Sequence, residues 1–229
     1  MTFDDIYRAI TKTGLKLRAA SHELPHHDAR TASASGTILL LGFAGRDGWD
    51  QFSNSAEARD KHPNPMDRWS SRVIGTLADE LGGVALFPFS GPPYLPFQQI
   101  ALSTGQMFRS PLGVLIDPHY GLWHAFRGAL AFAHKLDLSK LDLSKSEPNT
   151  SPCETCADKP CLSACPVGAF TQSGYNVPLC SDHLHSKSQT CTVQGCLARN
   201  ACPVGAEHKY SPDQMRFYMA AFKAAHPKP

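Results

Sequence analysis

The chain has 229 residues, of which 42% are hydrophobic and 18% are charged, a balance typical of a folded globular protein. Its formal charge of +2 at pH 7 is too small to indicate a nucleic-acid partner. The N-terminal residues show no secretory signal, and the longest apolar stretch, 37–44, is too short to cross a bilayer. We therefore expect a cytoplasmic protein without a membrane-spanning segment.

The N-terminal third begins with a helix pattern and continues into a strand pattern. Apolar residues recur with helical spacing over 4–20, although Gly14 is expected to interrupt the helix. The run 37–45 is apolar and ends in a glycine turn, which indicates a buried strand.

The clearest helix of the chain follows. Asn64 and Pro65 suit the start of a helix, an apolar face runs from Met66 to Leu81, and Gly82 suits the end. A strand is expected over 84–89. Strand, helix and strand in this order predict a β-α-β unit with a buried sheet.

Three further elements are expected. Residues 97–104 suit a short helix, and 111–117 and 122–132 suit two strands joined by turn residues, as in a hairpin. Near the end, Ser211 and Pro212 predict the start of a helix with an apolar face.

All eight cysteines lie between Cys153 and Cys202. Because a cytoplasmic location disfavours disulfides, metal binding is the better interpretation. Eight thiolates are the ligands of two [4Fe-4S] clusters. Two structural zinc sites are the alternative, but only one Cys-x2-Cys pair is present, whereas zinc ribbons favour two such pairs.

The spacing of the cysteines predicts interleaved clusters. In a closely spaced run, the last cysteine, followed by proline, serves the neighbouring cluster. The sequence Ala-Cys-Pro-Val-Gly-Ala occurs at 164–169 and again at 201–206, so the exchange is expected in both directions. The first cluster would take Cys153, Cys156, Cys161 and Cys202, and the second would take Cys165, Cys180, Cys191 and Cys196.

Two departures from the bacterial two-cluster pattern affect this assignment. Four residues separate Cys156 from Cys161, where that pattern has two. In the second run, Ala198 stands at the position that corresponds to Cys161. The isolated Cys180 must then supply the missing ligand, and the roles of the cysteines from 180 to 196 stay open.

A domain boundary is expected before the cysteines. The pentapeptide Lys-Leu-Asp-Leu-Ser is doubled over 135–144, and a polar, proline-containing stretch follows. The sequence thus predicts an α+β domain over 1–134, a linker over 135–152, and a cluster-binding domain over 153–229.

The first domain resembles the cobalamin-processing family of decyanases and dealkylases. The resemblance is carried by Ile116-Asp-Pro-His-Tyr-Gly-Leu-Trp-His-Ala-Phe-Arg-Gly-Ala-Leu130, by His62-Pro-Asn64, and by the stretch Ala85–Pro93. It implies a flavin-reductase-like α/β sandwich with cobalamin in a large cavity.

The cysteine half resembles the ferredoxin-like cluster domain of epoxyqueuosine reductase. There, too, a Cys-Pro run is followed by an isolated cysteine, here Cys180, and by a second group that ends in Cys-Pro. That family couples two cubane clusters to a cobalamin. Its tRNA activity is not expected here, because no equivalent of its proton-donating acid is evident.

The first resemblance also implies a set of cofactor-binding residues, although it assigns no catalytic residue. Arg127 resembles an arginine associated with the thiol co-substrate site of that family, and a structural salt bridge is its alternative role. For the aromatic members, core packing is the alternative. The set is Tyr94, Trp123, His124, Phe126, Arg127 and Gly128.

These features predict a reductase that passes low-potential electrons through two [4Fe-4S] clusters to a bound corrinoid, either cofactor or cargo. A flavodoxin or a ferredoxin reductase is the expected kind of electron donor. One alternative is a ferredoxin-like carrier whose N-terminal domain docks a partner and binds no corrinoid. Another is a reductase that uses flavin on the same fold. The sequence has no dinucleotide-binding glycine motif, which disfavours a Rossmann-type nicotinamide site.

Overall fold

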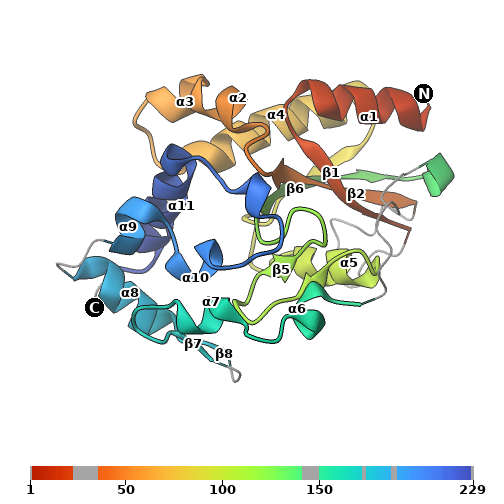
Figure 1. Cartoon of the computed structure of the whole chain (residues 1–229). Coiled ribbons are helices and arrows are strands. Elements are labelled where there is room, and N and C mark those ends of the chain that lie inside the picture. Colours follow the sequence, from red (N-terminus) through yellow and green to blue (C-terminus); the bar gives the residue numbers. More distant parts are fainter. Residues whose placement is uncertain (1, 23–35, 141–149, 172–173, 187–189, 228–229) are drawn as a thin grey trace. The chain divides into compact units, whose positions relative to one another are not determined.

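The computed structural model describes residues 2–22, 36–140, 150–171, 174–186 and 190–227 (Figure 1). The chain forms two compact units, and both are discontinuous in sequence. Unit 1 comprises Met1–Gln106 and His124–Glu147, and unit 2 comprises Met107–Trp123 and Pro148–Pro229. The segment 107–123 thus groups with the cysteines, whereas the sequence-based division left it in the first domain. Half of the expected linker, residues 141–149, lies outside the described residues.

Unit 1 is an α+β unit built on one antiparallel sheet with the strand order β1-β2-β6-β3. Its strands are β1 (Lys16–Ser21), β2 (Thr37–Ala44), β3 (Val84–Leu86) and β6 (His124–Phe132). Its helices are α1 (Phe3–Lys12), α2 (Trp49–Ser53), α3 (Ala56–Arg59), α4 (Pro65–Leu81) and α5 (Phe97–Ser103), with a 3₁₀ helix, η1, at Leu138–Lys140.

Strand β2 is an inner strand of this sheet. All eight of its residues are buried, which explains why the sequence is apolar without alternation and confirms the predicted strand. Its one hydroxyl is satisfied: Thr37 donates to the carbonyl of His134 at 3.3 Å and accepts the N–H of Leu136 at 2.8 Å. The hydroxyl of Thr37 is therefore buried together with its hydrogen-bond partners.

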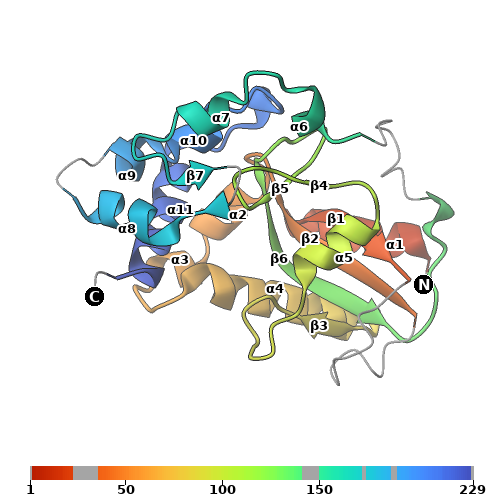
Figure 2. The same ribbon diagram turned by 90° about the horizontal axis from the view of Figure 1, so that it is seen from below.

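Helix α4 has the predicted bounds. It begins at Pro65 and ends before Gly82, whose φ of +65° is the left-handed value that glycine favours at a helix end. Asn64 precedes it, but its side chain makes no capping hydrogen bond. The helix contacts β3 and β6 (Figure 2). Strands β2 and β3 are both antiparallel to β6, so they run parallel to each other on either side of it.

A β-bulge interrupts the pairing of β2 with β6. Leu41 pairs with Gly128 and Gly42 pairs with Phe126, so Arg127 is the extra residue. Gly42 is needed at this point, because a Cβ there would lie 2.0 Å from the carbonyl oxygen of Ala125. A bulge breaks strict side-chain alternation and redirects the extra residue, here Arg127.

Two predicted elements differ from the structure. Residues 16–21 form β1, although the helix pattern extended to residue 20; the predicted break at Gly14 is confirmed. The expected hairpin between 111–117 and 122–132 is wrong. Strand β5 (Leu115–Ile116) pairs with β4 (Phe108–Arg109), whereas β6 pairs with β2 and β3.

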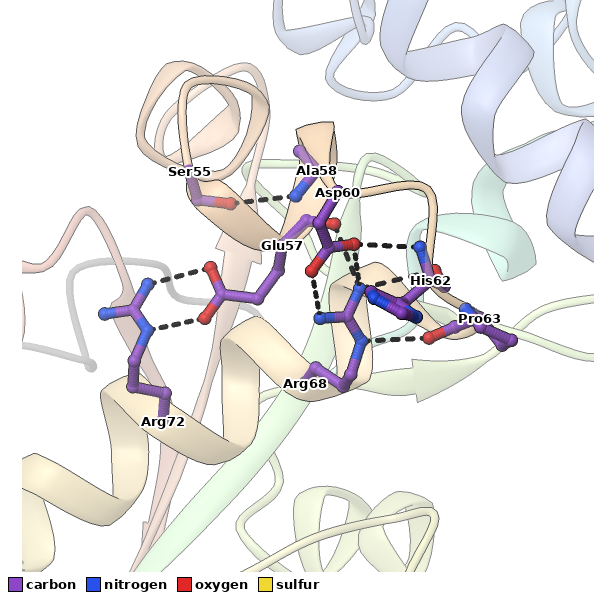
Figure 3. A network of polar contacts seen from close by, with 8 residues as sticks. All are labelled: Ser55, Glu57, Ala58, Asp60, His62, Pro63, Arg68 and Arg72. Carbon is purple, nitrogen blue, oxygen red and sulfur yellow. Dashed lines mark hydrogen bonds and ion pairs between the residues drawn. The ribbon is translucent and has the colours of Figure 1, made fainter.

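Helices α3 and α4 are joined by arginine–carboxylate pairs (Figure 3). Arg72 donates to both carboxylate oxygens of Glu57, at 2.5 and 3.0 Å. Arg68 donates to both oxygens of Asp60, each at 2.7 Å. His62, one of the residues that carried the first resemblance, donates its backbone N–H to Asp60 at 2.9 Å. These contacts fix the connection that leads into α4.

Unit 2 is built mainly of short helices. Two described two-stranded sheets accompany them, β4 with β5 and β7 (Phe170–Thr171) with β8 (Gly174–Tyr175). Its helices are α6 (Pro152–Thr155), α7 (Pro160–Ser163), α8 (Val177–His185), α9 (Thr190–Gln194), α10 (Leu197–Asn200), the 3₁₀ helix η3 (Ala206–His208) and α11 (Pro212–Ala225). The predicted start of α11, with Ser211 as its cap, is confirmed. No helix among the described residues is both long and apolar enough to cross a membrane.

Candidate metal centres

All eight cysteines belong to unit 2 and none forms a disulfide. Ser151 caps α6 and accepts the backbone N–H of Cys153 at 3.3 Å. Cys156 ends that helix, and Cys161 lies in the first turn of α7. The longer spacer between these two cysteines turns at Lys159, whose φ of +39° is uncommon for a residue with a side chain. The spacer thus reverses the chain between the two helices.

The Cys-Pro-Val-Gly repeat forms a left-handed turn in both copies. Gly168 has a φ of +62° and Gly205 has a φ of +64°, values that glycine adopts readily. In the first copy, the N–H of Ala169 donates to the sulfur of Cys165 at 3.3 Å. The two copies therefore share a left-handed glycine.

Four thiols form the first electrostatically linked group, which we call set one. Burial raises the pKa of Cys153, and charge on three neighbouring cysteines raises it further. Burial likewise raises the pKa of Cys161, with additional effects of Cys202 and Cys156. Such like-charge effects act at short range. Set one is Cys153, Cys156, Cys161 and Cys202.

The other four thiols form a second group, set two. Burial raises the pKa of Cys191, and the charges of Cys180 and Cys165 add to the effect. Burial also raises the pKa of Cys196 to about 11, with contributions from Cys191 and Cys180. Set two is Cys165, Cys180, Cys191 and Cys196.

Both sets contact one small apolar core. Its buried members are Leu112, Ile116, Leu122, Phe170, Ala198 and Cys202. Cysteines of both sets pack against it, including Cys161 of set one and Cys196 of set two. Helices α7 and α10, adjacent to these cysteines in sequence, contact each other (Figure 2). Ala198, at the position corresponding to Cys161, is 1% exposed and fills this core rather than facing a ligand site.

Hydrogen bonds to sulfur occur in both sets. In set two, the hydroxyl of Tyr175 donates to Cys180 and lowers its pKa against the larger effect of burial. In set one, Ser151 has the corresponding effect on Cys153. Backbone N–H groups contribute as well, from Val204 to Cys202 in set one. Such donors stabilise negative charge on sulfur.

Among the described residues, no group of three or more His, Cys, Asp or Glu side chains is arranged to hold a metal ion. A tetrahedral zinc ion at 2.3 Å from each sulfur would require thiolates about 3.8 Å apart. A cubane cluster separates its thiolates more widely, because each sulfur binds a different iron.

The residues expected to bind a corrinoid lie in different surroundings. Trp123 is 1% exposed and belongs to unit 2, where its ring packs against Tyr210 at 5.3 Å. Tyr94, in unit 1, is 66% exposed. One cavity along α1 and α4 and another in unit 2 have none of the six among their lining residues.

The rest of this set lies on β6. Phe126 contacts His124 and Phe97, with ring centres 5.8 and 6.3 Å apart. Gly128 permits close packing of α4, because a Cβ there would lie 2.6 Å from Ile74. These placements are those of core and sheet packing within unit 1.

Arg127 is engaged within unit 1. Its guanidinium lies 3.7 Å from the carboxylate of Asp67 on α4, and its Nε donates to the carbonyl of Phe126 at 2.7 Å. Burial raises the pKa of Asp67, and the charge of Arg127 opposes this rise. The salt bridge considered as an alternative role for Arg127 is therefore present.

Three residues near the thiols were not singled out from the sequence: Tyr175, Arg199 and Lys209. Tyr175 lies five residues before Cys180 and gives no motif; Arg199 and Lys209 lie within or just after the second cysteine group. Positive charge close to clustered cysteines was a usable signal for the last two, because thiolates need compensation.

Comparison with known proteins gives no matching family model and no matching curated protein.

Proposed function

We propose that unit 2 binds two [4Fe-4S] clusters, one on set one and one on set two, and that the protein transfers low-potential electrons. The observation that carries this proposal is the partition of eight thiols into two interacting sets of four. Each set draws one cysteine from the other's run, namely Cys202 and Cys165. This exchange is typical of ferredoxin-like two-cluster modules.

The side chains and backbone fit such a cofactor. The thiols are partly buried, and Tyr175, Ser151 and several backbone N–H groups donate to sulfur. When bound, the clusters supply one-electron transfer at potentials that depend on hydrogen bonding, net charge and solvent exposure. The chain would hold the sulfurs, limit the access of water, and stabilise the negative charge.

The first test is anaerobic purification followed by analysis of iron, sulfide and zinc. We expect a brown protein with about eight irons per chain and an equal amount of sulfide. A colourless protein with stoichiometric zinc would reject the proposal in favour of structural zinc sites.

Two variants test the division of the thiols. Cys156→Ser and Cys180→Ser should each reduce the iron content by about half, because each removes a ligand from a different set. Their electron paramagnetic resonance spectra should retain different signals. Ser163→Ala, at an exposed serine between Cys161 and Cys165, is the matched control and should retain all the iron.

A corrinoid on unit 1 is the proposed electron acceptor, with a flavodoxin or ferredoxin reductase as donor. The support is the resemblance around Ile116–Leu130 and the α+β character of unit 1, for which we propose the flavin-reductase-like arrangement. Cob(II)alamin added to the purified protein should change its absorption spectrum toward a base-off form. An unchanged spectrum, with no retention on gel filtration, would reject the corrinoid but not the clusters.

The ferredoxin-like carrier without corrinoid stays a second candidate. The ion pair between Arg127 and Asp67 favours it, because the guanidinium already has an anionic partner within unit 1. Substitution Arg127→Lys distinguishes the two candidates. If a corrinoid pocket includes Arg127, its affinity for cob(II)alamin should fall; if the residue serves only the ion pair, only stability should change.

A further inference from the structure

Arg199 holds an unusual position beside set two. Its Nε donates to the carbonyl of Leu122 at 3.0 Å, and its Nη2 donates to the same oxygen. Its guanidinium carbon lies 4.8 Å from the ring centre of Trp123 and 4.6 Å from that of Tyr210. Both rings are almost fully buried, at 1% and 2% exposure. The cation thus lies against two aromatic rings that also contact each other.

This cation has no carboxylate partner within ion-pair distance among the residues that the structure describes. A carbonyl and two rings supply only partial negative charge. A partly desolvated guanidinium usually has an anion close by, because an unpaired charge is costly to bury. A negative group close to Arg199 would compensate this charge.

The neighbouring negative group is the sulfur of Cys196. This cysteine is the N-cap residue of α10, and Arg199 lies in the same helix. Arg199 follows Cys196 by three residues, and residues three apart are neighbours on a helix surface. Cys196 packs against the same core as Leu122, whose carbonyl anchors the guanidinium.

We propose that Arg199 is the fixed counter-charge of set two and raises the reduction potential of the centre held there. This inference rests on the proposed function. One-electron reduction adds one negative charge to a group that already carries four thiolates. A nearby cation stabilises the reduced state more than the oxidised state, so it shifts the midpoint potential upward.

Set one offers a matched comparison. The Nζ of Lys209 donates at 2.8 Å to the carbonyl of Asn200, two residues before Cys202. The two cations should therefore act on different centres, Lys209 on set one and Arg199 on set two.

The test is a redox titration of the iron-loaded protein, followed by electron paramagnetic resonance, for the wild type and the variants Arg199→Gln, Arg199→Lys and Lys209→Gln. Arg199→Gln should make one of the two midpoints more negative and leave the other unchanged. Lys209→Gln should move the other midpoint. Arg199→Lys retains the charge and should show a smaller shift than Arg199→Gln.

Several outcomes would overturn the inference. They are no shift in Arg199→Gln, an equal shift of both midpoints, and a shift in Arg199→Lys as large as in Arg199→Gln. Loss of iron from both Arg199 variants would also overturn it, because the residue would then be needed to build the site rather than to set its potential. The iron and sulfide content of the wild type is measured first. Absence of both would reject the proposed function itself.

Discussion

Two glycines bring segments distant in sequence into close contact within unit 2. A Cβ on Gly121 would lie 1.9 Å from the carbonyl oxygen of Val204, and a Cβ on Gly205 would lie 2.4 Å from the carbonyl carbon of Tyr120. Both glycines also have positive φ values, +57° and +64°. The segment before β6 is therefore packed backbone to backbone against the second Cys-Pro-Val-Gly turn.

We predict that Gly121→Ala strongly destabilises unit 2. The left-handed conformation alone costs about 1–2 kcal/mol for a residue with a Cβ, and the clash with Val204 adds about 1–3 kcal/mol. Urea denaturation measures the loss of stability, and iron content measures the damage to Cys202 next to the turn.

Gly113→Ala is the control for this prediction. Gly113 also has a positive φ, +75°, but its nearest contact would be the Cβ of Tyr175 at 3.9 Å. It should show only the conformational cost. If Gly121→Ala and Gly113→Ala reduce the free energy of unfolding equally, the close approach of the two backbones at Gly121 adds nothing to stability.

A second prediction at this scale concerns Tyr175. The variant Tyr175→Phe should retain the fold, because the ring that stacks on Phe170 at 4.4 Å is preserved. Loss of the hydroxyl removes a hydrogen bond to Cys180. We expect the midpoint potential of the set-two centre to become more negative, as seen in a redox titration.

Tyr218→Phe serves as its control, since it removes another tyrosine hydroxyl of unit 2 and keeps the ring that stacks on Tyr210 at 5.3 Å. Unchanged midpoints in Tyr175→Phe would show that the hydroxyl does not influence the centre.

Among the secondary-structure elements, α3 and α4 are joined by two ion pairs, one of which is Arg72 with Glu57. Arg72 holds the pKa of Glu57 at about 2 through its hydrogen bonds. The ordinary value in an unfolded chain is about 4.3. A lowered pKa means that the pair contributes stability above the unfolded value, and that this contribution is lost as the pH falls toward 2.

We predict that Glu57→Gln destabilises unit 1 by about 1–2 kcal/mol near neutral pH, a value reduced because Arg72 is half exposed. The difference between wild type and variant should shrink below about pH 4 and vanish near pH 2. Urea titrations at several pH values, monitored by hydrogen exchange of the backbone amides in β2 and β6, measure this stability difference.

Asp213→Asn is the comparison for this pH series. It removes the exposed pair of Asp213 with Arg216 on α11, and such pairs contribute little. A pH-independent effect of Glu57→Gln would contradict the assignment of the ion pair as the source of the stability.

Elements with strong local signals were predictable from the sequence. Helices α4 and α11 have the expected starts, because Asn64-Pro65 and Ser211-Pro212 carry the information locally. The hairpin after residue 111 was not predictable in the same way. Asp117 and Gly121 bond to each other and close a tight turn, but the strands that flank the turn pair with other segments. Strand pairing depends on long-range packing, which local pattern does not record.

For the molecule as a whole, the two units depend on different interactions. Unit 1 has an apolar core around β2 that contains no cysteine, whereas the core of unit 2 is small and packs largely against cysteines. The membership of the two thiol sets followed from motif spacing. The membership of 107–123 in unit 2 did not, because Gly121, Leu122 and Trp123 contact residues more than seventy positions away.

We predict that removal of iron from the loaded protein unfolds unit 2 and leaves unit 1 folded. The buried thiols of unit 2 would lose the metal that compensates their burial, and metal binding is then coupled to folding. Hydrogen–deuterium exchange should show loss of protection in α7 and α10, with protection retained in β2 and β6. Equal loss in both units would contradict the independence of their cores.

The interleaving of the two thiol sets has a consequence for the order in which the protein matures. Neither set is complete until the last part of the cysteine region leaves the ribosome, since set two ends with Cys196 and set one with Cys202. A nascent chain that has exposed only the first run offers three thiols of one set and one of the other. The two centres would therefore be assembled almost together and late, after unit 1 has been fully translated.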